Sequence, residues 1–307
     1  MQHIARTKRR IIVADIYIFG SLNMDLVINA RNMPVRGETV VGEGFFANPG
    51  GKGANQAVAA SKLGGKVYMS GAVGDDSFGE QMLCNLKKYG VDVSKVRTVA
   101  GCESGVAVII VENGDNRIIL NSGANAKAGR DDVENLLQNA KEKDIFLTQL
   151  ENDIDVAGYA LKRAKEKGMF TVLNPAPANA RIKPYLKYVD LVTPNKGESE
   201  LLTGEKDHVL SAEKMPVENV VITLGGEGYY YKGKGVCLKG ECIKVRPVDT
   251  TAAGDTFCGA LVARLANGDD MENALKYASC AASLACTKKG AQQSVPEPKD
   301  VENAMKL

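Results

Sequence analysis

The chain has 307 residues, of which 44% are hydrophobic and 25% are charged, as is usual for a globular protein with a large buried core. The formal net charge is only +2, which excludes the strongly basic surface typical of proteins that bind nucleic acid. Tryptophan is absent and aromatic residues make up 6%, so a stacking platform for single strands is also excluded.

The seven cysteines are scattered along the chain and form no C-x-x-C pair, and neither His3 nor His208 lies near one, so no zinc site is expected. An odd cysteine count without a signal sequence favours reduced thiols and a cytoplasmic location. Residues 1–10 are basic, and Asp15 interrupts the apolar run that follows, which is too short for a membrane span. We therefore expect residues 1–15 to form a basic, frayed N-terminal extension, with an amphipathic transit segment as the alternative.

Short apolar segments alternate with helical patterns along most of the chain. Strands are predicted at 16–20, 67–70, 145–150, 170–173, 191–193 and 220–224, and helices at 54–63, from 77 onward, at 153–167, 254–266 and 271–287. Ser77 with Glu80 has the spacing of a capping box. The alternation predicts an α/β fold with three αβα layers, in which helices cover both faces of a mostly parallel sheet.

Two regions, about 24–48 and 103–121, interrupt this rhythm with strand-like alternation and no helix. Strands are expected there at 26–28, 39–41, 106–111 and 117–120. We expect them to form a small antiparallel sheet that acts as a lid over the carboxyl edge of the parallel sheet, where ligands usually bind. The lid would belong to one domain that spans residues 16–307.

A turn of small residues at 249–257 leads into one of the long predicted helices. The first N–H groups of a helix favour an anion, and Ala252, Ala253 and Gly254 have little side chain to keep one away. Asp255 would lie beside that anion, placed to accept a proton, which suggests phosphoryl transfer to a hydroxyl. An ordinary helix capped by Asp255 after a tight turn is the alternative.

Several other polar groups follow predicted strands. The glycine-rich segment 50–56 offers donors from Lys52 and Asn55 but does not match a Walker A loop, and it could equally be a plain strand-to-helix turn. Asn23 and Asp25 suit adjacent hydroxyls of a polyol, although such pairs are also common in turns. Glu151 is a further acid at a strand end, where simple solvation is the alternative.

Two more segments suit a nucleotide. Asn195 and Glu198 are one helical turn apart and could hold hydrated Mg²⁺ beside phosphates, or form a capping box. The glycine turn at 223–228 could lie along a nucleotide, although a lone turn of this kind is weak evidence.

Taken together, these segments resemble the ribokinases of the PfkB carbohydrate kinase family over residues 17–296. The motifs that carry the resemblance lie, in chain order, at 20–25, 50–56, 74–76, 122–125, 174–178, 193–195, 249–257 and 289–296. The motif at 249–257 marks the wider family, whereas those at 50–56, 174–178 and 290–296 are typical of ribokinases.

The resemblance implies phosphorylation of the 5-hydroxyl of D-ribose by ATP, with Mg²⁺ and an activating K⁺. It implies that Asp255 is the catalytic base and that the N–H groups of Ala252, Ala253, Gly254 and Asp255 form an anion hole. The implied sugar-contacting positions are Asn23, Asp25, Gly51, Lys52, Asn55, Glu151 and Asp255. The implied ATP positions are Asn195, Thr223, Leu224, Gly225, Gly226, Glu227, Gly228, Gly254, Asp255 and Ser279. Glu198 would organise Mg²⁺ through water, and the implied K⁺ positions are Asp249, Thr251, Ala285, Lys288, Gly290 and Ser294.

The resemblance leaves alternatives open. The substrate could be 2-deoxyribose, a nucleoside or another sugar, and a non-catalytic sugar sensor could reuse the fold. The segment between Asn195 and Thr223 is short and lacks a long amphipathic helix at 205–216, and Ser279 stands where some relatives have a larger residue. Because an exposed lid has edge strands that a second subunit could cover, a homodimer through the lid is expected, with no nucleic-acid or membrane partner.

Overall fold

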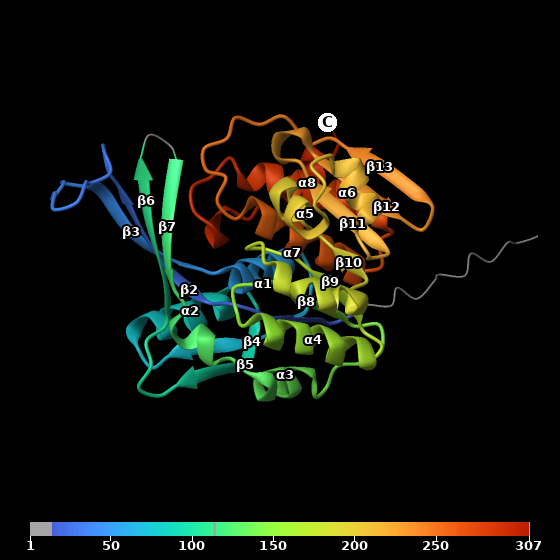
Figure 1. Ribbon diagram of the computed structural model, residues 1–307, viewed down its shortest axis with the longest axis horizontal. Coiled ribbons are helices and arrows are strands. Elements are labelled where there is room, and N and C mark those ends of the chain that lie inside the picture. Colours follow the sequence, from blue (N-terminus) through green and yellow to red (C-terminus); the bar gives the residue numbers. More distant parts are fainter. Residues whose placement is uncertain (1–13, 113–114, 307) are drawn as a thin grey trace, which may run out of the picture.

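The computed structural model describes residues 14–112 and 115–306 (Figure 1). Within these residues a 9-stranded sheet has the order β13-β12-β11-β10-β9-β8-β1-β4-β5. Its strands are β1 (Ile16–Phe19), β4 (Val67–Gly74), β5 (Asp92–Val99), β8 (Ile145–Thr148), β9 (Phe170–Leu173), β10 (Leu191–Val192), β11 (Asn219–Thr223), β12 (Tyr229–Gly233) and β13 (Val236–Gly240). All pairings from β5 to β11 are parallel, and β12 and β13 add antiparallel strands at one edge. The predicted mostly parallel sheet is therefore confirmed.

Helices form a layer on each face of this sheet, as predicted. One layer contains α1 (Lys52–Lys62), α2 (Ser77–Lys88), α7 (Ala253–Ala266), α8 (Met271–Ala285) and α9 (Pro298–Ala304). The other contains α3 (Arg130–Leu137), α4 (Ile154–Glu166), α5 (Lys196–Thr203), α6 (His208–Lys214) and the 3₁₀ segment η2 (Ala180–Tyr188). Side chains of β1 alternate between the two resulting cores, because successive residues of a strand point to opposite faces.

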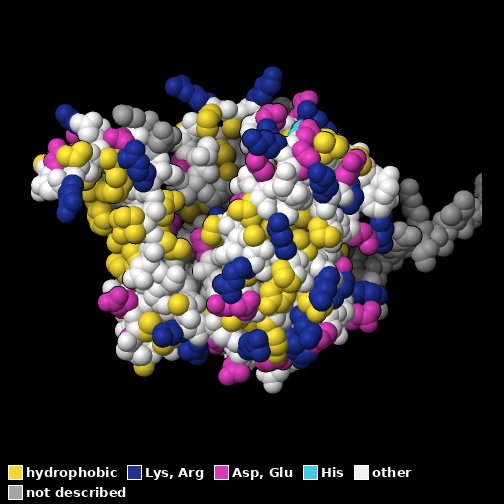
Figure 2. Space-filling view, in the orientation of Figure 1, with side chains coloured by type: hydrophobic (Ala, Val, Ile, Leu, Met, Phe, Trp, Pro, Cys, Tyr) yellow, Lys and Arg dark blue, Asp and Glu magenta, His cyan; other side chains and the backbone are white. Residues whose placement is uncertain are grey.

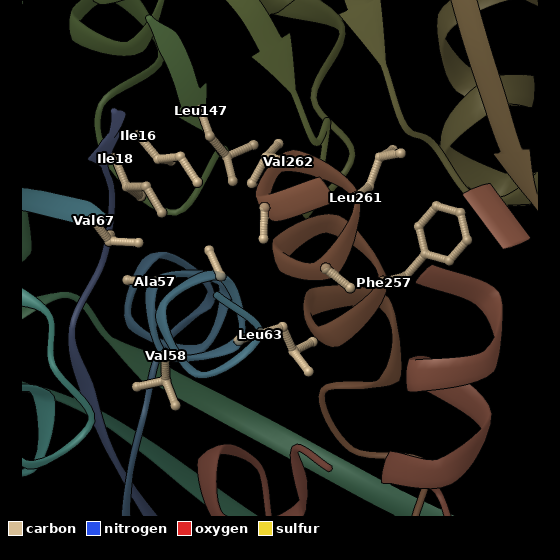
Figure 3. Close-up of a cluster of buried hydrophobic side chains, with 14 of the residues drawn as sticks. Ile16, Ile18, Ala57, Val58, Leu63, Val67, Leu147, Phe257, Leu261 and Val262 are labelled. Atoms are coloured by element: carbon tan, nitrogen blue, oxygen red, sulfur yellow. The ribbon is translucent and has the colours of Figure 1, made fainter. Parts of the chain in front are cut away.

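Helices α1 and α7 lie side by side on the sheet, with apolar side chains between them and β1 (Figure 3). Their backbones approach closely: a Cβ added to Gly259 of α7 would lie 2.5 Å from Cβ of Ala59 and 2.6 Å from the carbonyl oxygen of Gln56. This close contact requires small residues at the crossing. It also brings the first turns of the two helices together, which matters for the site described below.

A 4-stranded sheet with the order β3-β2-β6-β7 stands beside the main body (Figure 1). Its strands are β2 (Asn23–Asn29), β3 (Glu43–Gly50), β6 (Gly105–Glu112) and β7 (Asp115–Asn121). The pairs β2–β3 and β6–β7 are antiparallel, whereas β2 and β6 run parallel. The strand predicted at 39–41 is wrong, because Asn29 at the end of β2 already pairs with Glu43, so residues 39–41 have no partner strand and lie in a loop.

Local details differ from the sequence patterns. Asp76, not Ser77, caps α2, and its carboxylate accepts a hydrogen bond of 2.8 Å from the N–H of Gly79. Strands β5, β12 and β13 and helices α3 and α9 were not predicted. The expected absence of a long helix at 205–216 agrees with the seven residues of α6.

The predicted N-terminal extension at 1–15 lies mostly outside the described residues. Ala14 and Asp15 are hydrogen-bonded to the body of the domain, through the Ala266 carbonyl oxygen and the Asp144 carboxylate. None of the helices in the described residues combines the length and apolarity that a bilayer crossing requires.

Candidate active site

Polar residues gather at the carboxyl edge of the parallel sheet, where β1, β8, β9, β10 and β11 end. The same edge meets the N-termini of α1, α5 and α7, so loops from distant parts of the sequence converge there. Strand β1 lies between β4 and β8: the polypeptide adds β4 and β5 on one side of β1 and later adds β8 to β13 on the other. Such a switch point creates a crevice outside the strand ends.

Asp255 lies in the first turn of α7 and is only 6% exposed. Its Oδ2 accepts a hydrogen bond of 3.0 Å from Nδ2 of Asn55, and its Oδ1 accepts one of 2.9 Å from Nε2 of Gln56. The carboxylate therefore does not cap its own helix. It is held by two amides of α1, as the close α1–α7 contact allows.

The start of α7 remains open toward the crevice. Ala252 occupies the N-cap position in the left-handed region, with φ 57°, and no side chain among the described residues caps the helix. A Cβ added to Gly254 would meet no atom within 4 Å. The N–H of Ala253 donates to the carbonyl oxygen of Thr250 at 3.2 Å, and the other N–H groups of this turn face space that an anion can fill.

A second cluster surrounds Glu151. Its Oε2 accepts hydrogen bonds from Oγ of Ser21 at 2.5 Å, the N–H of Lys52 at 3.0 Å and Nδ2 of Asn23 at 3.4 Å. Gly51 has φ +87°, and a Cβ there would lie 2.7 Å from the N of Asn23, so the turn needs a glycine. These contacts fix a rigid polar wall between β2 and α1.

Four acids and one lysine share this region. Burial, followed by the charges of Glu151 and Asp255, raises the pKa of Asp25 to about 7. The charge of Asp255 is the main cause that raises the pKa of Lys52, against its partial burial. Burial also raises the pKa of Glu198. Lys52 thus stays charged and compensates part of the negative potential around Asp255.

Two connected cavities open beside this cluster, with volumes of about 340 and 610 Å³. The smaller one reaches Asp255 and Lys52, and the larger one is lined by apolar groups such as Phe257 and Ala282. They share the residues Thr223, Gly225, Thr250, Ala253 and Gly254. A polar chamber joined to an apolar one suits a ligand with a charged end and a flat ring.

Most positions expected to contact ATP line these cavities. Asn195 lines the smaller one, Gly226, Gly228 and Ser279 line the larger one, and Thr223, Gly225 and Gly254 line both. Leu224 lines neither and is buried in the core, and Glu227 points away into an exposed ion pair with Lys196.

Asn195 and Glu198 form the capping box of α5. The Asn195 side chain accepts from the N–H of Glu198 at 2.9 Å, and the Glu198 carboxylate accepts from the N–H of Asn195 at 2.8 Å. Both residues also line the smaller cavity. The capping interpretation and the ligand-binding interpretation are therefore compatible here.

The residues expected to hold a monovalent cation lie on two loops that Asp249 joins. Its carboxylate accepts hydrogen bonds of 2.9 Å from the N–H of Thr251 and from the N–H of Gly290. Burial raises the pKa of Asp249, but these hydrogen bonds to the carboxylate outweigh it, so the pKa lies below its usual value. The carbonyl oxygen of Ala285 accepts a hydrogen bond from the N–H of Lys288. Ser294, six residues after Lys288, has a buried side chain.

Carboxylate and carbonyl oxygens of this kind suit a hard cation. Across the described residues, no three His, Cys, Asp or Glu side chains gather as ligands for a metal ion.

Sequence reasoning did not single out Ser21, Gln56, Asn125 and Asn174. Asn125 donates to Oδ1 of Asn23 at 2.8 Å, and Asn174 accepts from Gln56 at 3.0 Å. All four lie inside the motifs that carried the resemblance, which was the available signal. The hydrogen bonds Asn125–Asn23, Gln56–Asn174 and Ser21–Glu151 join residues that are 102 to 130 positions apart in sequence.

A buried aspartate at an open helix start, between a rigid polar wall and a two-part cavity, defines a phosphotransferase that acts on small hydroxyl compounds. The family model described as pfkB family carbohydrate kinase matches residues 13–298, and the chain belongs to this family.

Individual relatives agree with this assignment. The chain is 37% identical to a ribokinase of Schizosaccharomyces pombe, over 95% of this chain and 98% of the relative. It is 35% identical to a deoxyribokinase of Salmonella typhi, over 92% and 95% of the two chains.

Solved structures are similar as well. A ribokinase of Thermotoga maritima is 34% identical with a TM-score of 0.86, covering 96% of this chain and all of that one. An Arabidopsis thaliana ribokinase complexed with ribose and ATP is 30% identical with a TM-score of 0.85, covering 96% of this chain and 99% of that one.

Proposed function

We propose that this protein transfers the γ-phosphoryl group of ATP to the 5-hydroxyl of D-ribose, which yields ribose 5-phosphate and ADP. The observation that carries the proposal is the buried carboxylate of Asp255, held by two amides at the open start of α7. The similarity to a ribokinase complexed with ribose and ATP supports the choice of substrates.

In this mechanism Asp255 accepts the proton of the primary hydroxyl as that oxygen bonds to the γ-phosphorus and the bond to the leaving ADP oxygen breaks. The N–H groups from Ala252 to Asp255 stabilise the charge on the transferred group. Because protein groups offer little covalent help in phosphoryl transfer, fixed orientation matters most. The two amide hydrogen bonds to Asp255 supply that orientation.

The wall formed by Asn23, Asp25, Gly51, Glu151 and the start of α1 is our candidate for the sugar site. Asn23 and Glu151 are held by neighbouring polar groups, so they can hydrogen-bond sugar hydroxyls with little loss of side-chain entropy. ATP would place its phosphates in the smaller cavity and its adenine in the larger one. Ser279 would lie beside the adenine.

The similarity to a deoxyribokinase makes 2-deoxyribose the second candidate substrate. Steady-state kcat/KM values for D-ribose, 2-deoxyribose, fructose and adenosine with Mg-ATP and K⁺ test the choice. We expect ribose to give the highest value, and a clear preference for another compound would overturn it. Sugar binding without any turnover would instead favour the non-catalytic sensor.

Two cations are part of the proposal. Glu198 would hold Mg²⁺ through water, and Mg²⁺ when bound neutralises charge on the ATP phosphates. Asp249 with oxygens of Thr251, Ala285, Lys288, Gly290 and Ser294 would hold K⁺. Replacing KCl by tetramethylammonium chloride should lower kcat, and equal activity in both salts would remove the K⁺ site.

We also propose that the protein acts in the cytoplasm and forms a homodimer through the lid. Apolar side chains gather on the projecting lid (Figure 2), among them Phe45, Ile118 and Ile119, which are 65%, 56% and 68% exposed. Such a patch usually marks an interaction surface. Sedimentation equilibrium of the wild type and of Ile119→Lys should give a dimer and a weakened dimer, and a monomeric wild type would contradict this.

A further inference from the structure

A continuous chain of side-chain amides, buried at Asn55 and Gln292 and half-buried at Asn85, leads away from Asp255. Asn55 donates to Oδ2 of Asp255 at 3.0 Å, and its own Oδ1 accepts from Nε2 of Gln292 at 3.2 Å. Oε1 of Gln292 in turn accepts from Nδ2 of Asn85, on α2, at 2.5 Å. Asn55 and Gln292 are 7% and 2% exposed, so water does not replace these partners.

The direction of this chain is set by its end. A carboxylate accepts hydrogen bonds, so Asn55 must turn its NH₂ group toward Asp255 and its oxygen away. That oxygen needs a donor, which obliges Gln292 to present its own NH₂ group and to turn its oxygen toward Asn85. Each amide therefore has one orientation that satisfies both neighbours, and reversing one leaves a buried group unpaired.

A second, shorter chain holds the other oxygen of Asp255. Nε2 of Gln56 donates to Oδ1 of Asp255 and to Oδ1 of Asn174, and Oε1 of Gln56 accepts from Nε2 of Gln149 at 2.6 Å. Oε1 of Gln149 has no hydrogen-bond partner among the described residues. The carboxylate orders this chain too, and the unpaired oxygen lies at its far end.

Gln292 occupies a particular place in the fold. It begins the 3₁₀ segment η4 (Gln292–Ser294), within the turn that starts at Gly290. The N–H of Gly290 donates to Oδ2 of Asp249 at 2.9 Å, and Oγ of Ser294 donates to the carbonyl oxygen of Ala291 at 2.7 Å. The turn that holds two of the proposed cation ligands therefore also holds the residue that orients Asn55.

We propose that Gln292 is a positioning residue that couples the Gly290–Ser294 turn to the base Asp255 through the amide of Asn55. This inference rests on the proposed function. When a monovalent cation orders the turn, Gln292 is held so that its NH₂ group faces Asn55, and Asn55 then fixes the carboxylate. When the turn is loose, Asn55 is free to reverse, and Asp255 loses one of its two donors.

The test compares kcat and the KM for ATP in KCl and in tetramethylammonium chloride for the wild type and five variants. Gln292→Glu has almost the same shape but presents only acceptors, and Gln292→Met has neither donor nor acceptor. Asn55→Ala and the double variant Asn55→Ala/Gln292→Met complete a double-mutant cycle. Gln293→Met, at the exposed neighbouring position, is the matched control.

We expect Gln292→Glu and Gln292→Met to lower kcat in KCl about 10-fold, as the loss of one buried hydrogen bond implies, with the KM for ATP within about 2-fold. Their ratio of activities in the two salts should fall toward 1. In the Asn55→Ala background, Gln292→Met should change kcat less than about 2-fold, because the side chain through which Gln292 acts on Asp255 is already absent. Gln293→Met should match the wild type.

Some results would overturn the inference. These are unchanged kcat in both Gln292 variants, a Gln292→Met effect of equal size with and without Asn55, or a wild type indifferent to the two salts. Melting temperatures identify a Gln292 variant that fails to fold. In that case Asn85→Ala, which removes the last amide of the hydrogen-bonded chain, is measured in its place. A wild type that does not phosphorylate ribose contradicts the proposed function instead, and the comparison is repeated with the preferred sugar.

Discussion

Replacing Asp25 by asparagine should stabilise the ligand-free protein above pH 7. The pKa of Asp25 is raised from 3.8 to about 7 in the folded state, because its carboxylate is buried near Glu151 and Asp255. Between these two pH values the folded protein holds a proton that the unfolded chain has released, so the stability of the wild type falls as pH rises. A difference of about 3 pKa units corresponds to about 4 kcal/mol, reached at pH 7 and constant above it.

Asparagine has nearly the same shape and does not titrate. The free energy of unfolding of Asp25→Asn, minus that of the wild type, should therefore rise by about 4 kcal/mol between pH 4 and pH 8. Urea unfolding followed by circular dichroism at pH 4, 6 and 8 measures this difference, with the exposed Asp131→Asn as control. A difference that stays constant with pH, or a less stable variant at pH 8, would refute the reasoning.

The ionised carboxylate of Asp25, which lowers the stability of the free protein, is also expected to strengthen sugar binding. Sugar hydroxyls donate hydrogen bonds to the ionised carboxylate, so the affinity of the wild type for ribose should increase as pH rises through about 7. Asp25→Asn should bind ribose more weakly at pH 8 in spite of its greater stability. Isothermal titration calorimetry at pH 6 and pH 8 checks both statements.

Three further predictions concern single positions. Asp255→Asn should lower kcat by about 10²–10⁴ with an unchanged melting transition, and full ribose-dependent ADP production would contradict its role as base. Gly51→Ala should cost about 1–3 kcal/mol in urea unfolding because of its positive φ and the clash with Asn23; Gly204→Ala, also at positive φ but facing open space, should cost less, and equal losses would contradict the clash. Glu198→Gln keeps an acceptor for the capping box, so it should raise the Mg²⁺ concentration for half-maximal activity rather than unfold α5; an unchanged Mg²⁺ titration would argue against its role.

The alternation of strands and helices could be predicted because it depends on local properties. A strand such as β1 that is buried on both faces reads as a continuous apolar run, and α4 (Ile154–Glu166) has Asp153 as its N-cap and ends before Gly168. The strand predicted at 39–41 was wrong because the prediction used local properties alone. Alternation alone does not tell whether a partner strand is present, and here β2 ends before it could pair.

The site could be predicted only in part. The motif at 249–257 contained a carboxylate and a helix start, but a helix capped by its own aspartate would look the same. The structure separates the two, because the partners of Asp255 are Asn55 and Gln56 on α1, about 200 residues earlier in the chain. Those contacts depend on the α1–α7 packing at Gly259, which no local pattern reports.

By itself, then, the sequence determined the class of fold, the order of most of its elements and many of the residues that line the candidate site. Propensity, apolar periodicity and glycine turns act over a few residues, and they are written directly in the chain. Only the tertiary structure decided which polar groups face one another, which way the amides of Asn55 and Gln292 point, and that Asp25 takes up its proton near neutral pH. These properties arise from burial and from contacts between distant segments, since a hydrogen bond or a shifted pKa depends on what lies opposite the group.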